Sequence, residues 1–399
     1  RKALAEGRRR PASHSSAPRP VRPCGEVAGP YVVVHIRTGS WHRTWMRLQP
    51  AVWRGAAAAH HERTTRLLLG SSGSDAESHP IFNFLFTYLR ADPDVLCRWS
   101  PGPSSMLVSG LSRPHEPHLW RGRGLRRLDG SSDCSYPVTA ARAGTGGAWS
   151  RTASLLRATA HRPPNLHCYG LHEWAMLYRP EGYPPPPKFQ QGLPLRVSQD
   201  ELNRTVDSLQ PRCTHYDAFR FFAPAAVPLN AHQPQPSRRN VADLTQPGCV
   251  HASMDLLRQA LALYPHLPSE IVHDTLELAI DARLLDIRAS PYDLRAAPQS
   301  ARRRFDLSPV RVEAPGGRRE FQAMQADLAR RAAPLRLRLL ACYDEALRLL
   351  DAAETAPAVV TEAATLSGSR EAAAEPGATA VTAGAAPHVH TRVGIFEHL

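Results

Sequence analysis

Three consecutive segments in the C-terminal half of the chain repeat apolar side chains at the spacing of an α-helix. The first runs from His251 to Tyr264, the second from Pro268 to about Ile287, and the third from about Glu320 to Leu350. The apolar positions of the second segment are dense enough for a helix in the core. A kink is expected at Pro334 in the third. Segments in which apolar and polar residues alternate, as in half-buried strands, are scarce. The pattern therefore predicts a mainly α-helical protein.

Shorter helical patterns precede these three segments. They are expected near residues 53–69, 79–89, 151–160, 171–178 and 198–209. The last of them begins with Ser198 as N-cap and Glu201 three residues later, which is the capping-box spacing. Together the helical patterns predict one helical core domain over residues 48–350.

Three other segments lack sustained periodicity. Residues 1–47 are predicted to be a disordered or transit-like leader, residues 101–148 a long flexible insertion, and residues 351–399 a disordered tail. The insertion is rich in Gly, Ser, Pro and Arg, which favour loops. The 37 prolines of the chain fit a fold in which such segments carry part of the excess.

Charge and cysteine content limit the partners and the compartment. Most of the net charge of +13 lies in the first 60 residues, so the central part is only mildly basic and has no obvious stripe for gripping DNA. Seven widely spaced cysteines favour an intracellular, reducing compartment. The Arg-rich, acid-poor start resembles a mitochondrial or chloroplast transit peptide, and a disordered leader is the alternative. No apolar run is long enough to predict a membrane span.

Several enzyme classes lack their usual sequence support. The only lysines are Lys2, in the leader, and Lys188, after a run of four prolines, which argues against Schiff-base chemistry. The sequence contains no P-loop, no GxGxxG after a strand, no GxSxG and no HExxH. Kinase, dinucleotide oxidoreductase and serine hydrolase functions are therefore not favoured.

Three short clusters each combine a cysteine, a histidine and a carboxylate. They span residues 167–174, 213–217 and 249–255. Their histidines, His172, His215 and His251, are candidate ligands for Fe, Mn or Zn. On a helix His251 and Asp255 would share one face, and they could bind one ion or form a base and its orienting partner. The alternative is a polar pocket without metal, with the cysteines as small buried apolar residues.

A fourth cluster covers residues 281–294 and places several charges at the predicted end of a helix. Arg283 and Arg288 could grip a phosphate or carboxylate group. The alternative is an internal salt-bridge network, with Asp286 and Asp293, that fixes the exit of the helix.

Five stretches, at 79–88, 170–176, 212–222, 246–255 and 288–294, resemble a mostly actinobacterial family commonly labelled 3-methyladenine DNA glycosylase. The resemblance extends over about residues 50–100 and 150–350. It implies a base-excision enzyme that acts on damaged DNA and hydrolyses the N-glycosidic bond of an alkylated base flipped into an aromatic pocket.

The resemblance also implies which residues serve the reaction. The catalytic carboxylate would be Glu173, Asp217 or Asp255. Trp174, Tyr216 and Phe219 would form the walls of the substrate-binding pocket, and the other expected substrate-binding residues are Arg220, Arg288, Tyr292 and Asp293. The residue chemistry itself leaves a second function open, a helical metal-dependent oxidase or hydrolase that acts on a small molecule.

Overall fold

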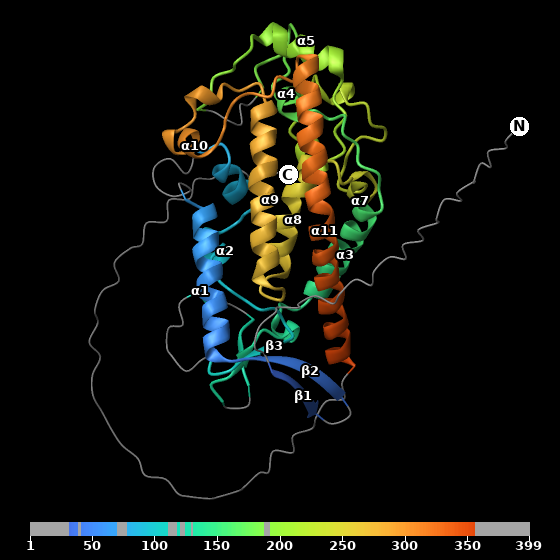
Figure 1. Ribbon diagram of the computed structural model, residues 1–399. Coiled ribbons are helices and arrows are strands. Elements are labelled where there is room, and N and C mark those ends of the chain that lie inside the picture. The colour runs from blue at the N-terminus through green and yellow to red at the C-terminus, as the bar shows by residue number, and fades with distance from the viewer. Residues whose placement is uncertain are drawn as a thin grey trace, which may run out of the picture. The chain divides into compact units, whose positions relative to one another are not determined.

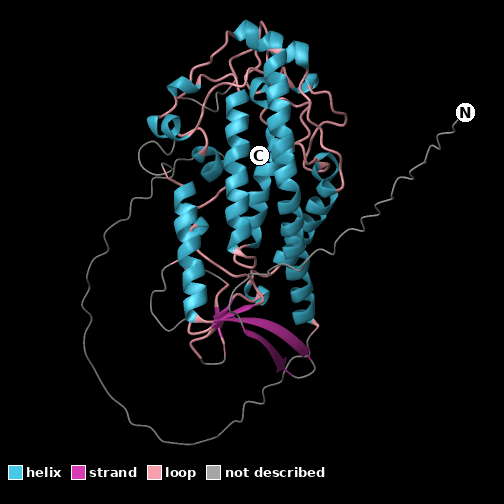
Figure 2. Cartoon of the chain, viewed as in Figure 1, coloured by secondary structure: helices cyan, strands magenta, loops and turns pink. Residues whose placement is uncertain are grey.

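The computed structural model describes residues 32–38, 41–69, 78–110, 118–119, 124–128, 131–186 and 192–355 of the 399-residue chain. Over this part the protein is mainly helical, which confirms the predicted fold class (Figure 2). Of the predicted leader, residues 32–38 and 41–47 are described and lie in two strands rather than in a disordered segment. Of the predicted tail, only residues 351–355 are described, at the end of the last long helix. Among the described helices none is both long and apolar enough to cross a bilayer.

The three helices predicted in the C-terminal half form the centre of the structure. They are α8 (Val250–Leu263), α9 (Ser269–Ala289) and α11 (Pro315–Glu354), with Pro334 inside α11. The three pack against one another, and α3 (Thr145–Ala160) packs along α11 (Figure 1). Most residues of α9 are buried, as its dense apolar pattern predicts.

Shorter elements complete the helical part. They are α1 (Pro50–Leu67), α2 (Pro93–Leu96), α4 (Leu171–Ala175), α5 (Gln199–Leu209), α6 (Tyr216–Phe219), α7 (Val241–Leu244), α10 (Gln299–Arg304), a π-helical turn at Phe84–Tyr88, and 3-10 turns at Val138–Ala140, Val227–Leu229 and Leu294–Ala296. The predicted N-cap of α5 is confirmed, because the hydroxyl of Ser198 accepts a hydrogen bond of 3.2 Å from the Glu201 amide.

A small sheet contains five strands: β1 (Val32–Thr38), β2 (Trp41–Leu48), β3 (Ser105–Leu107), β4 (Arg126–Arg127) and β5 (Cys134–Ser135). Their order is β1-β2-β3-β5-β4. The β1–β2 hairpin is antiparallel and pairs Val32 with Arg47 through to Thr38 with Trp41, whereas β2 and β3 run parallel.

The sheet differs from the prediction of a flexible insertion at residues 101–148. Three of its strands lie within that segment, and Cys134 and Tyr136 there are fully buried. Strands of two or three residues are too short to give an alternating pattern. β3 pairs with β2, β5 with β3 and β4 with β5, and Leu107 and Cys134 pack in the same cluster as Trp53.

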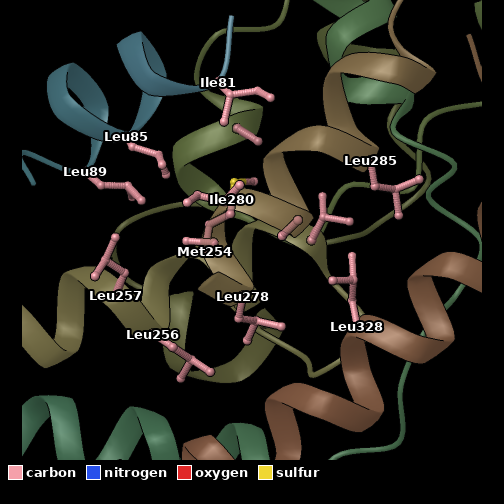
Figure 3. Packing of buried hydrophobic residues seen from close by; sticks show 14 of the residues in the cluster. Ile81, Leu85, Leu89, Met254, Leu256, Leu257, Leu278, Ile280, Leu285 and Leu328 are labelled. Carbon is pink, nitrogen blue, oxygen red and sulfur yellow. The ribbon is translucent and has the colours of Figure 1, made fainter. Parts of the chain in front are cut away.

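The main core lies between the long helices and the segment around the π-helical turn. Figure 3 shows side chains from α8, α9, α11 and that segment gathered in one cluster: Ile81, Leu85, Leu89, Met254, Leu256, Leu257, Leu278, Ile280, Leu285 and Leu328. This packing fixes the positions of α4, α8 and α9, which carry the site described next.

Candidate metal centre

Three helices bring two imidazoles and a carboxylate together in the interior. His172 lies on α4, His251 in the first turn of α8, and Asp286 near the end of α9. Each of the three offers a ligand atom, and these atoms all lie within 4.8 Å of one another. All three side chains are buried, and Asp286 is completely so. The structure thus groups two of the three histidines predicted as metal ligands with a carboxylate that was not.

Close packing sets the position of α4 against α9 and α11. Gly170 precedes α4 at a φ of +67°, and a Cβ at this position would lie 3.3 Å from both Ala289 and Phe321. The indole of Trp174 donates a hydrogen bond of 2.9 Å to the carbonyl of Ala289. Because these contacts leave α4 little room to move, His172 is held toward Asp286.

The contact between His172 and Asp286 is unusual in its geometry. Nε2 of His172 and Oδ1 of Asp286 are 2.8 Å apart, but they are not aligned as a hydrogen bond, and neither atom has another partner in the described part of the chain. Two ligand atoms that each lie about 2.1 Å from one ion would be about 3.0 Å apart at the right angle of an octahedral site and about 3.4 Å apart at a tetrahedral angle. The geometry therefore suits two groups that face a common third atom.

Burial and charge together set the protonation of these groups. Burial lowers the pKa of His251 well below its ordinary value, so its imidazole is neutral and free to act as a ligand. Burial alone would also lower the pKa of His172, but the Asp286 carboxylate outweighs it and raises that pKa. Burial would likewise raise the pKa of Asp286, and the charges of His172 and Arg283 lower it instead. A metal ion would bind the deprotonated imidazole, so it would displace the proton that His172 otherwise holds.

A buried arginine, Arg283, binds the Asp286 carboxylate through the oxygen that does not face His172. Arg283 donates to Oδ2 of Asp286 at 2.5 Å and to Glu173 at 2.7 Å, and its Nε donates to the carbonyl of Pro80 at 3.2 Å. The guanidinium is only 1% exposed. Arg283 therefore belongs to an internal salt-bridge network, the second of the two roles left open by the sequence. The same network engages Glu173, one of the predicted catalytic carboxylates.

A second histidine–carboxylate pair lies beside the first. Nε2 of His215, at the start of α6, is hydrogen-bonded to Asp255 at 2.9 Å, and Asp255 also accepts from Arg258 at 2.9 Å. The His215 ring stacks on that of His251 with 5.1 Å between centroids. Burial would raise the pKa of Asp255, but His215 and Arg258 outweigh it and lower the pKa to about 2.

This pairing differs from the predicted one. His251 and Asp255 do lie on one helix four residues apart, but Asp255 is bound by His215 and Arg258, whereas His251 belongs to the group with His172. The helical spacing alone cannot reveal this, because the partner of Asp255 comes from a loop 40 residues earlier in the chain.

A small cavity of about 10 Å³ adjoins the ligand group. This is roughly the space that one water molecule needs. Its lining joins residues from all three predicted clusters: Cys168, His172, Arg212, Cys213, Thr214, Gln246, Cys249, Val250 and His251. Burial raises the pKa of the three thiols, to about 12 for Cys213, so they stay protonated at neutral pH. Arg212 is exposed, which brings the cavity near the surface on that side.

None of the other predicted site residues belongs to the group of three candidate ligands. Trp174 and Tyr292 are buried in the core, and Asp293 caps a 3-10 turn and pairs with Arg295 at 2.7 Å. Arg288 donates to the carbonyl of Ser308 at 2.7 Å. Tyr216, Asp217, Phe219 and Arg220 lie in and beside α6, where Asp217 pairs with Arg258 at 3.0 Å.

Sequence reasoning missed Asp286 as a ligand. Its position near a helix end, three residues after Arg283, indicates an ion pair, and one of its oxygens does form that pair. Asp286 lies on a completely buried helix face, and another buried segment carries a histidine. These two features together are the signal that could have identified Asp286 as a ligand.

Comparison with known proteins finds no matching family model, no similar curated protein and no similar solved structure.

Proposed function

We propose that this protein is a metal-dependent oxidase or hydrolase that acts on a small molecule, with His172, His251 and Asp286 as the ligands of the ion. The observation that supports it best is the pair of buried, unaligned ligand atoms on His172 and Asp286. Two imidazoles and one carboxylate suit Fe(II) in oxidases and Zn(II) in hydrolases, and Mn(II) accepts the same donors. Three protein ligands leave coordination positions open for water, oxygen or substrate.

The surrounding residues have matching roles in this proposal. Arg283 binds only one oxygen of Asp286 and so orients the other toward the ion, as outer-shell partners commonly do. His215 would carry a proton to or from the reacting group, because its ring lies against that of His251 and its Nδ1 is buried without a partner. Asp255 would hold the His215 imidazole in one orientation through its bond to Nε2.

The test is metal content in protein purified without an affinity tag and dialysed extensively. We expect about one equivalent of Fe, Mn or Zn per chain in the wild type and strong loss in the His251→Gln variant. The matched control is His266→Gln, because His266 is also buried but bonds to the Tyr136 carbonyl away from the centre. Full metal occupancy in His251→Gln, or a folded wild type that takes up none of the three ions, would refute the proposal.

The glycosylase function implied by the family resemblance is a second candidate. The observation that favours it is the setting of Asp217, whose side chain is 23% exposed, against 7% for both Glu173 and Asp255. Arg220 lies over the Phe221 ring at 4.3 Å nearby, and stacked cation and aromatic groups suit contact with DNA.

This second candidate has its own test. Wild-type protein should release methylated bases from alkylated DNA, and Asp217→Asn should abolish the release without loss of fold. No release by the wild type would exclude the glycosylase function. Release that survives metal chelation and the Asp286→Asn substitution would favour it over the metal-dependent one.

A further inference from the structure

A second unusual charge lies on α11, outside the metal centre. Arg336 is only 2% exposed, and no described residue forms a hydrogen bond or ion pair with it. Its Nη2 atom is buried without any partner. Burial lowers the pKa of Arg336 to about 10, which leaves the guanidinium charged at neutral pH.

An unpaired guanidinium in the interior is costly, and buried charges are almost always paired. The other fully buried arginine, Arg283, follows this rule with two carboxylates. An apolar side chain of similar length would fill the space of Arg336 at lower cost. The presence of an arginine at this buried position is therefore explained best by an anion that it binds.

The surroundings of Arg336 provide space for such an anion. It lines a cavity of about 360 Å³ between α11 and the loop that follows α3. This volume falls in the range of small-molecule sites, roughly 300–1,000 Å³. The walls are mostly apolar, with Leu166 and Pro247 on one side and alanines of α11 on the other.

The charged residues of the cavity are all positive. Besides Arg336, only Arg162 and Arg330 contribute charged groups to its lining, and no acidic residue does. Arg162 donates to the Thr245 carbonyl at 2.8 Å, and Arg330 pairs with Asp327. A ligand here meets one unpaired cation at a buried position and an apolar surface beside it.

We propose that this cavity binds a small organic anion, a carboxylate or phosphate monoester with an apolar body, whose acid group pairs with Arg336. The apolar body would lie against Leu166, Pro247 and the alanine face of α11. The lining of this cavity shares no residue with that of the small cavity beside the metal centre, and the proposal does not depend on the proposed function.

The experiment measures binding of two probes, octanoate and hexyl phosphate, to the full chain by titration calorimetry. Octanamide and hexanol are the uncharged counterparts of these probes. We expect binding of at least one anionic probe, and much weaker binding of its uncharged counterpart. In Arg336→Met the affinity should fall roughly 10- to 100-fold, since a charge-assisted hydrogen bond is lost. Binding of octanoate alone would show that the site selects a carboxylate. Binding of hexyl phosphate alone would show that it selects a phosphate monoester.

Two comparisons separate a ligand-binding role from a structural one. Arg338→Met removes a cation two residues further along α11 that pairs with Asp274 and does not line the cavity, so it should bind the probes as the wild type does. Arg336→Met without ligand should unfold at the same denaturant concentration as the wild type or a higher one. Equal affinity in Arg336→Met, no binding of either probe by the wild type, or equally strong binding of the uncharged compounds would overturn the proposal.

Discussion

Arg283 precedes Asp286 by one turn of α9 and binds only one of its two carboxylate oxygens. The guanidinium donates to Oδ2, and Oδ1 remains directed at His172. The same guanidinium donates to Glu173, so two buried carboxylates depend on a single arginine. The arginine thus stabilises the fold of this region and at the same time orients a candidate metal ligand.

Replacing Arg283 with Met should destabilise the protein strongly. Glu173 would remain buried without its counter-charge and Asp286 would keep only His172, and breaking a buried ion pair in this way costs about 3–5 kcal/mol. Arg331→Met is the matched control, because Arg331 also pairs with an aspartate of α9, Asp281, but both side chains are more than one-third exposed. The loss of unfolding free energy in Arg331→Met should stay below about 1 kcal/mol. Denaturant unfolding measures both losses, and equal losses would contradict the role of Arg283 as the counter-charge of two buried carboxylates.

Bound metal should stabilise the folded protein. An ion that binds only the folded state adds about 2.7 kcal/mol at a free concentration 100 times its Kd. Addition of Zn(II) or Mn(II) to metal-free protein should therefore raise the Tm of the wild type. The Asp286→Asn variant should show no such increase, because it loses an anionic ligand at the centre. A similar increase in both proteins would mean that the ion binds elsewhere.

The long helices were predictable from sequence because each repeats apolar residues over many turns, so that single exceptions do not hide the period. For this reason α9 begins and ends close to the predicted positions, whereas α11 extends beyond the predicted helix at both ends. The β3 and β5 strands were not predictable, because two or three residues give no period and their pairing partners are distant in the chain.

The candidate site was predictable only in part. His172 and His251 were predicted as candidate ligands because each lies close in the sequence to a cysteine and a carboxylate. The partnership of His172 with Asp286 depends instead on the packing of α4 against the end of α9, which no local pattern encodes. For the same reason Asp255 pairs with His215 rather than with its helical neighbour His251.

The contribution of Asp255 to stability should depend on pH. Its pKa in the folded protein is about 2, below the ordinary value of 3.8, so its stabilising effect is present above pH 3.8 and is lost as pH falls through 2. Asp255→Asn removes this titration. The difference in unfolding free energy between the wild type and this variant should therefore shrink by about 1 kcal/mol from pH 5 to pH 3. A difference that stays constant over this range would contradict the lowered pKa.

Gly170→Ala should weaken both stability and metal binding. The residue has a φ of +67°, and the added Cβ would meet Ala289 and Phe321 at 3.3 Å, so α4 would have to shift away from α9. We expect a loss of about 1–3 kcal/mol and a lower metal affinity, because His172 moves with α4. Gly182→Ala is the control: its φ is +84°, but nothing lies within 4 Å of the added Cβ. It should show only the backbone strain, with metal content unchanged, and an equal loss of metal in both variants would argue against α4 packing as the determinant of the site.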